Sequence, residues 1–115
     1  ACASSNGQMG ALEALKGPQD SVKKMVGEFE KRRDLITSRL IEMGYELPVP
    51  DGAFYVYPKI ENPMEFVKKA SDAGVITVPG APFGKNGNKH VRMSYANSYE
   101  NIKKAMDILE GLWNE

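Results

Sequence analysis

The chain has 115 residues, with 15 basic and 15 acidic side chains and one cysteine. This length suits a single domain with its own core and excludes a large multidomain architecture. The balanced charge gives no net field that would attract nucleic acid or an anionic membrane, although a local basic patch is compatible with zero net charge. Because Cys2 is the only cysteine, an intramolecular disulfide is excluded, and the chain fits a reducing cytoplasm.

The N-terminal end resembles neither a signal peptide nor a membrane anchor. Its first residues lack the charged and apolar regions of a signal peptide, and no apolar run in the chain approaches membrane-spanning length. The chain starts with Ala1 rather than Met. We therefore expect either that it begins inside a longer gene product or that the Met was removed.

Helical periodicity dominates the first part of the chain. Residues 11–15 predict a short helix that ends at Gly17-Pro18, because glycine suits a helix C-terminus and proline suits the start of the next segment. Apolar residues then recur at three- and four-residue spacing and predict one long amphipathic helix that ends at Gly44. They are Val22, Met25, Val26, Phe29, Ile36, Leu40 and Met43.

The middle of the chain alternates between strand and helix signals. After the turn signal Asp51-Gly52, residues 53–57 are aromatic and β-branched and predict a first strand. Residues 62–65 read Asn-Pro-Met-Glu, a capping-box arrangement that predicts a short helix ending at Gly74. Residues 75–78 predict a second strand, and the prolines and glycines of residues 79–84 predict a fixed loop.

The C-terminal part contains a third strand and a last helix. Residues 90–95 predict the strand, and Ser98 caps the helix. The helix is predicted to bury one stripe, formed by Ile102, Ala105, Met106, Leu109, Leu112 and Trp113. The order helix, strand, helix, strand, strand, helix predicts an α/β (α+β) sandwich, with a small, mainly antiparallel sheet of about three strands covered by helices. We expect the second and third strands to be antiparallel.

Arg92 is the first candidate for a ligand contact, because it is the one charge in the otherwise apolar strand pattern of residues 91–96. A guanidinium is always ionised, and it grips a carboxylate or phosphate with two parallel hydrogen bonds. The alternative is a structural ion pair with an acidic residue of the same chain.

Other components of catalytic sites are scarce. One histidine and one cysteine exclude zinc sites and Cys-His nucleophiles. His90 is interpreted as a solvent-exposed structural residue. Residues 84–89 lack the spacing of a P-loop and are interpreted as a hairpin tip. The aromatic residues Phe54, Tyr55 and Tyr57 have no basic residues interleaved with them, which favours core packing over nucleic-acid stacking.

Four segments of the chain, taken in order, resemble the C-terminal small domain of the class I and II, fold-type I, aminotransferases, the aspartate-aminotransferase-like enzymes that use pyridoxal phosphate. They are Gln8 with residues 11–15, PDGAFYVYP at 50–58, VITVPGAPFG at 75–84 and VRMSYA at 91–96. Together they span nearly the whole chain.

The resemblance implies a specific role for several residues. The arginine of the last segment, Arg92 by position, binds the substrate α-carboxylate in this family. The loop that carries Gly80 and Phe83 lies near the active-site mouth, and Phe54 and Tyr55 could touch the substrate entrance. Core packing remains the alternative for Phe54, Tyr55 and Phe83.

The resemblance also implies how the chain is organised and what it lacks. Residues 1–17 would be a junction segment from the large domain, and residues 18–115 the small domain. The intact enzyme would be a cytoplasmic homodimer that moves an amino group between an amino acid and a 2-oxo acid. Its pyridoxal phosphate, Schiff-base lysine and phosphate-binding groups belong to the large domain and have no counterpart here. We therefore expect this chain alone to be inactive and to bind no cofactor.

Two alternatives remain open. Other fold-type I enzymes, such as carbon-sulfur lyases and amino-acid decarboxylases, share much of this region. A free-standing regulatory module that binds a small carboxylate would also use an α/β sandwich. The substrate side chain is likewise open, with aspartate, aromatic and diaminopimelate-type substrates all compatible with these residues.

Overall fold

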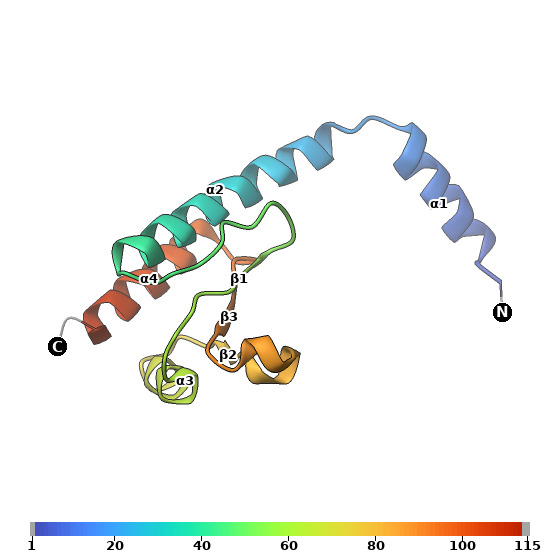
Figure 1. The fold of residues 1–115 in the computed structure, drawn as a ribbon. Coiled ribbons are helices and arrows are strands. Elements are labelled where there is room, and N and C mark those ends of the chain that lie inside the picture. Colours follow the sequence, from blue (N-terminus) through green and yellow to red (C-terminus); the bar gives the residue numbers. More distant parts are fainter. Residues whose placement is uncertain (1, 114–115) are drawn as a thin grey trace.

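A computed structural model describes residues 2–113, with the side chain of Trp113 outside the description. The helices and strands follow one another as Figure 1 shows: α1 (Ser5–Lys16), α2 (Asp20–Glu42), β1 (Tyr55–Val56), α3 (Pro63–Asp72), β2 (Val78–Pro79), β3 (Val91–Ser94) and α4 (Tyr99–Trp113). Two short 3₁₀ helices, η1 (Ala81–Phe83) and η2 (Lys85–Gly87), lie between β2 and β3. From α2 onward, the predicted order of helices and strands is confirmed.

The sheet has three strands in the order β1-β3-β2, and both pairings are antiparallel. This confirms the predicted small antiparallel sheet. The strands are shorter than predicted, for local reasons. Ala53 has a left-handed φ of 58°, so the extended chain begins only after it. The amide of Val75 donates to the Ala70 carbonyl at 2.8 Å, so the chain is still leaving α3 there and pairs with β3 only from Val78.

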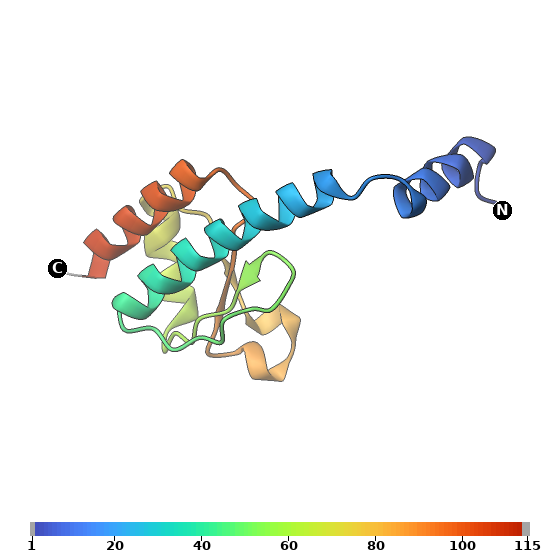
Figure 2. The ribbon, with the colours of Figure 1, turned by 90° about the horizontal axis from the view of Figure 1, so that it is seen from above.

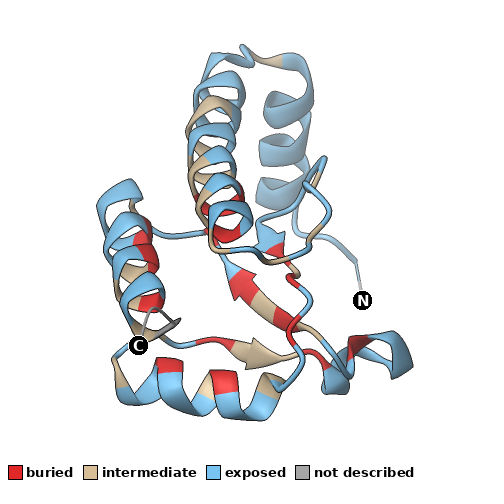
Figure 3. Cartoon of the chain, turned by 60° about the vertical axis from the view of Figure 1, so that its left-hand side comes forward, coloured by how far each residue is buried: buried red, intermediate tan, exposed pale blue. Residues whose placement is uncertain are grey.

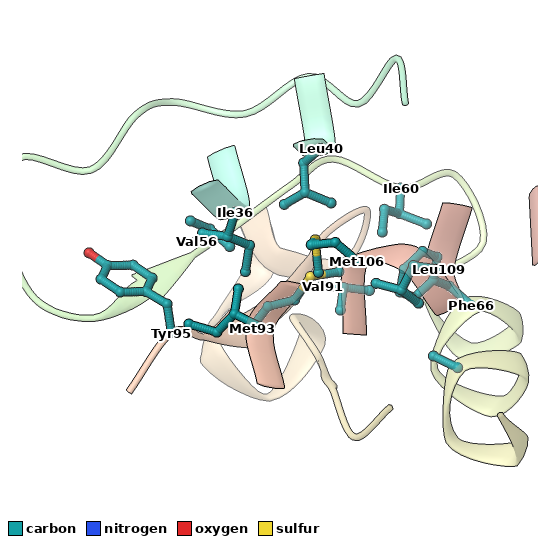
Figure 4. Packing of buried hydrophobic residues seen from close by; sticks show 12 residues of the cluster. Ile36, Leu40, Val56, Ile60, Phe66, Val91, Met93, Tyr95, Met106 and Leu109 are labelled. Carbon is teal, nitrogen blue, oxygen red and sulfur yellow. The ribbon is translucent and has the colours of Figure 1, made fainter. Parts of the chain in front are cut away.

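One hydrophobic core lies between the sheet and three helices, as the close view in Figure 4 shows. The core is one cluster of buried residues from α2, α3 and α4, from the strands β1 and β3, and from the residues that follow these strands. Its members are Ile36, Leu40, Val56, Ile60, Phe66, Ala70, Val91, Met93, Tyr95, Ile102, Met106 and Leu109. Tyr95 lies at one end of this cluster with its hydroxyl pointing away from it, and the hydroxyl donates to the Ala53 carbonyl at 3.1 Å. Burial raises the pKa of the Tyr95 phenol, so the hydroxyl stays protonated and keeps this bond.

The first helix and the start of the second form an arm that leaves the body of the molecule (Figures 1 and 2). The radius of gyration is 17.7 Å, whereas a compact chain of this size would have about 13 Å. Every residue of α1 is exposed, as Figure 3 shows. In α2 the predicted apolar stripe is buried only in its second half, because Val22, Met25 and Val26 lie on the arm and are exposed.

Helices α3 and α4 begin at the predicted residues, but the predicted capping hydrogen bonds form only at the start of α4. Asn62 is the N-cap of α3 with Pro63 in its first turn, yet the Asn62 side chain makes no capping hydrogen bond. The Glu65 carboxylate pairs with Lys69 at 2.9 Å instead of reaching back to the helix start. The capping box predicted here is therefore wrong. At the start of α4, Ser98 does cap, since its hydroxyl accepts a hydrogen bond from the Asn101 amide at 3.2 Å.

Replacing this cap should weaken the fold measurably. Ser98→Ala leaves the Asn101 amide without its side-chain acceptor and is expected to lower the free energy of unfolding by about 0.5–2 kcal/mol. Urea unfolding followed by circular dichroism measures the loss. Ser71→Ala is the matched control, because Ser71 is an exposed serine in the last turn of α3. Equal losses in the two variants would contradict the assigned cap.

Candidate carboxylate-binding site

Strand β3 places Arg92 on the face of the sheet that the helices leave open. Along β3, Val91 and Met93 are buried, Arg92 is half-buried and Ser94 is exposed. Neighbouring side chains on a strand point to opposite faces of the sheet. Because Val91 and Met93 pack in the core with the helices, the Arg92 side chain points to the other face.

Two aromatic rings hold the Arg92 guanidinium. Its central carbon, Cζ, lies 4.1 Å from the centre of the Phe83 ring and 4.5 Å from the centre of the Tyr55 ring. An aromatic ring attracts a cation through the negative potential of its face. Both contacts therefore stabilise the guanidinium without neutralising its charge.

No acidic side chain neutralises Arg92 within residues 2–113. The ion pairs there join other residues, mainly lysines on the helices and loops. The structural ion pair that the sequence left open is thus not formed in the part of the chain that the structure describes. A partly desolvated cation without a carboxylate partner is the arrangement expected of a site that receives an anion.

The two rings reach Arg92 from segments far apart in the sequence. Tyr55 is opposite Ser94 in the β1–β3 pairing, so it lies on the same face of the sheet as Arg92 and diagonal to it. Phe83 belongs to η1, which follows β2, and β2 pairs with β3 so that Val78 faces Arg92. The antiparallel sheet therefore brings three separate sequence segments to one point.

The aromatic residues of this region are not core residues. Phe54 and Tyr55 are exposed, and 51% of the Phe83 surface is exposed. The Phe54 ring lies 4.5 Å from that of Tyr55 and 6.3 Å from that of Phe29. Core packing was the favoured interpretation of Phe54 and Tyr55, and it is wrong. Tyr55 lies on the open face of the sheet, and Phe54 stays exposed although its ring lies near Phe29 of α2.

The loop between β2 and β3 is held by its own backbone. The Phe83 amide donates to the Gly80 carbonyl at 2.9 Å, and the Gly87 amide donates to the Gly84 carbonyl, also at 2.9 Å. Gly80 and Gly87 are both buried. Residues 84–89, predicted as a hairpin tip, do connect the antiparallel strands β2 and β3, with η2 in the middle.

The described residues do not fit a covalently bound pyridoxal phosphate. A lysine that forms an imine must lose its proton readily, which burial promotes. Every lysine between residues 2 and 113 is exposed, and several pair with carboxylates, such as Lys59 with Glu46 and Lys89 with Glu61. The hydrogen bond and charge of Asp72 raise the pKa of the Lys68 amine, which keeps that amine protonated.

Residues 2–113 contain neither a cluster of metal-binding side chains nor a membrane-spanning helix. That part of the chain contains no group of three His, Cys, Asp or Glu side chains placed to bind a metal ion. None of its helices is both long enough and apolar enough to cross a membrane.

The chain is similar to aminotransferases both in sequence and in structure. A family model described as "Aminotransferase class I and II" matches residues 1–109. The probable aspartate aminotransferase of Methanocaldococcus jannaschii is 43% identical over 116 residues, which cover 98% of this chain and 31% of that protein. The aromatic-amino-acid aminotransferase 2 of Thermococcus litoralis is 39% identical over 115 residues, covering 94% of this chain and 30% of that protein.

Solved structures agree with these matches. The alanine aminotransferase from Pyrococcus furiosus superimposes with a TM-score of 0.89 at 34% identity, covering 98% of this chain and 30% of that one. The aromatic aminotransferase from Pyrococcus horikoshii gives a TM-score of 0.82 at 38% identity, covering 89% of this chain and 29% of that one. The chain thus spans about 30% of the length of the relatives it matches. It belongs to the class I and II aminotransferase family.

Proposed function

We propose that this chain is the C-terminal small domain of a pyridoxal-phosphate-dependent aminotransferase, and that Arg92 binds the α-carboxylate of its amino acid and 2-oxo acid substrates. The observation that supports this proposal is the environment of the Arg92 guanidinium. Its guanidinium is half-buried on the open face of the sheet, contacts two aromatic rings, and has no carboxylate partner within residues 2–113.

The geometry suits a planar anion. The cation–π contacts use the faces of the two aromatic rings. The five N–H donors of the guanidinium lie in its own plane, and none of them forms a hydrogen bond or ion pair within residues 2–113. A carboxylate that meets these donors edge-on forms two parallel, charge-assisted hydrogen bonds. Two such bonds fix the position and the orientation of the substrate Cα, which is what a reaction at the Cα–H bond requires.

Pyridoxal phosphate, which the family uses, supplies the electron sink for chemistry at the amino acid Cα. Because no lysine in residues 2–113 is buried, we propose that residues outside this chain bind the cofactor. The contribution of this chain is then to bind and orient the carboxylate. Alone, it should neither bind the cofactor covalently nor transfer an amino group.

The N-terminal arm supports a division at residue 17. Residues 1–17 would be a junction segment with the large domain, and residues 18–115 the small domain. In α1 the apolar side chains of Met9, Leu12 and Leu15 are exposed. Exposed apolar groups on a helix are costly unless another surface covers them, and the longer relatives have the chain length to provide one. By resemblance, we further propose a homodimer in the cytoplasm.

The experiment that tests this function uses the full-length protein. After titration with pyridoxal phosphate, which is followed by absorbance, a panel of amino acids is supplied together with a 2-oxo acid acceptor. We expect one new amino acid to form for each amino donor consumed. Release of carbon dioxide or of a thiol without use of the acceptor would instead identify a decarboxylase or a carbon-sulfur lyase. Carboxylate binding without any cofactor would identify a regulatory module.

A further inference from the structure

Gly80 is the point where three parts of the chain are joined by hydrogen bonds. Its carbonyl oxygen accepts one bond from the Tyr57 hydroxyl at 3.0 Å and another from the Phe83 amide at 2.9 Å. Its own amide donates to the His90 carbonyl at 2.8 Å. A single peptide position therefore links the segment after β1, the helix η1 and the residue that precedes β3.

The Tyr57 hydroxyl fits closely against two glycines. A Cβ atom added at Gly80 would collide with the Tyr57 hydroxyl oxygen and with the Gly87 carbonyl oxygen. A Cβ atom added at Gly87 would lie 2.6 Å from the same hydroxyl oxygen. Since real Cβ atoms do not approach other atoms so closely, glycine at both positions leaves the space that the hydroxyl occupies.

The Tyr57 ring, like its hydroxyl, has a defined partner, which is the His90 ring. It stacks on the His90 ring with 5.1 Å between the ring centres and 6° between the planes. Stacking fixes the direction in which the phenol points, and the hydrogen bond fixes its end. Tyr57 thus connects β1 to the loop of residues 80–87 with little freedom.

Phe83 connects the hydrogen-bonded Gly80 to Arg92. Its amide is bound to the same Gly80 carbonyl that Tyr57 holds, and its ring lies 4.1 Å from the Arg92 Cζ atom. Phe83 is half-exposed, so its position depends on the loop backbone more than on packing around the ring. We propose that Tyr57 is a positioning residue for Arg92: through Gly80, its hydroxyl holds Phe83 against the guanidinium and so orients the guanidinium for the substrate carboxylate. The inference rests on the proposed role of Arg92.

The test compares Tyr57→Phe with the wild type in the full-length protein. This variant keeps the stacking ring and removes only the hydroxyl. Hydrogen–deuterium exchange should become faster at the Phe83 and Gly87 amides. The KM for amino acid and 2-oxo acid should rise roughly two- to tenfold, the loss expected from one neutral hydrogen bond. The kcat should stay near the wild-type value, because a uniformly weakened carboxylate contact raises KM alone.

Two further variants separate positioning from general stability. Tyr95→Phe is the matched control, since it also removes a tyrosine hydroxyl that donates to a backbone carbonyl, at Ala53, away from the loop. It should leave both the loop exchange and KM unchanged. Phe83→Leu removes the ring but leaves the Gly80 hydrogen bonds in place, and it should raise KM about as much as Tyr57→Phe.

The outcomes distinguish this inference from the function it rests on. Unchanged loop exchange in Tyr57→Phe, or an unchanged KM when Arg92→Lys raises KM strongly, overturns the positioning role and leaves the role of Arg92 intact. Unchanged kcat/KM in Arg92→Lys overturns the carboxylate contact itself, and the positioning role with it. Faster exchange together with a raised KM in Tyr57→Phe, and neither effect in Tyr95→Phe, supports the positioning role of Tyr57.

Discussion

Arg92→Lys in the full-length protein is expected to lower kcat/KM for amino acids and 2-oxo acids by a factor on the order of tens to thousands. Losing one member of a desolvated, hydrogen-bonded charge pair costs roughly 2–5 kcal/mol, and each 1.4 kcal/mol or so is a factor of ten. Lysine keeps the positive charge but loses the planar fork that would bind both carboxylate oxygens, and it loses the guanidinium that lies against the rings of Tyr55 and Phe83. Steady-state kinetics with saturating cofactor measures the effect.

Cofactor binding is the internal control for this variant. Because Arg92 is assigned to the substrate, the absorbance titration with pyridoxal phosphate should be nearly unchanged. Arg39→Lys is the matched substitution, since Arg39 is also half-buried but binds Asp107 and Glu110 at 2.8 Å and 2.7 Å between α2 and α4. It should leave kcat/KM close to wild type. Normal kinetics in Arg92→Lys would remove Arg92 from the substrate site.

Leu40→Ala is expected to lower the free energy of unfolding by about 2–5 kcal/mol, the range seen when a buried leucine is truncated and a cavity remains. Leu40 is 0% exposed and lies in the core between α2, the sheet and α4. Its neighbour Ile41 is 52% exposed on the same helix. Ile41→Ala should therefore cost much less. Urea unfolding of the two variants measures the difference, and equal losses would show that the core does not lie on the Leu40 side of α2.

The position of Arg92 on the open face of the sheet could be predicted from the residues next to it in the chain. The alternation of apolar and polar residues in 91–96 separates Val91 and Met93 from Arg92, and the period of a strand turns that alternation into two faces. Helix order and the antiparallel pairing followed from similarly local signals. These features depend on residues that are neighbours in the chain.

The surroundings of Arg92 could not be predicted in the same way. Tyr55 and Phe83 reach it only through strand pairing, and the Tyr57–Gly80 bond joins residues 23 positions apart. Tyr55 has the composition of a core residue, but composition does not reveal which face of a sheet lacks a covering helix. The apolar stripe of α2 shows the same limit, because its periodicity predicts an apolar face and not what covers Val22 or Met25.

The most direct test of the central claim is a crystal structure of the full-length protein with a bound amino acid or an unreactive carboxylate analogue. We expect two guanidinium nitrogens of Arg92 to lie about 2.7–2.9 Å from the two α-carboxylate oxygens, with the rings of Phe83 and Tyr55 still against the guanidinium. A ligand whose carboxylate is bound by other residues, with Arg92 contacting only the two rings, would contradict the account.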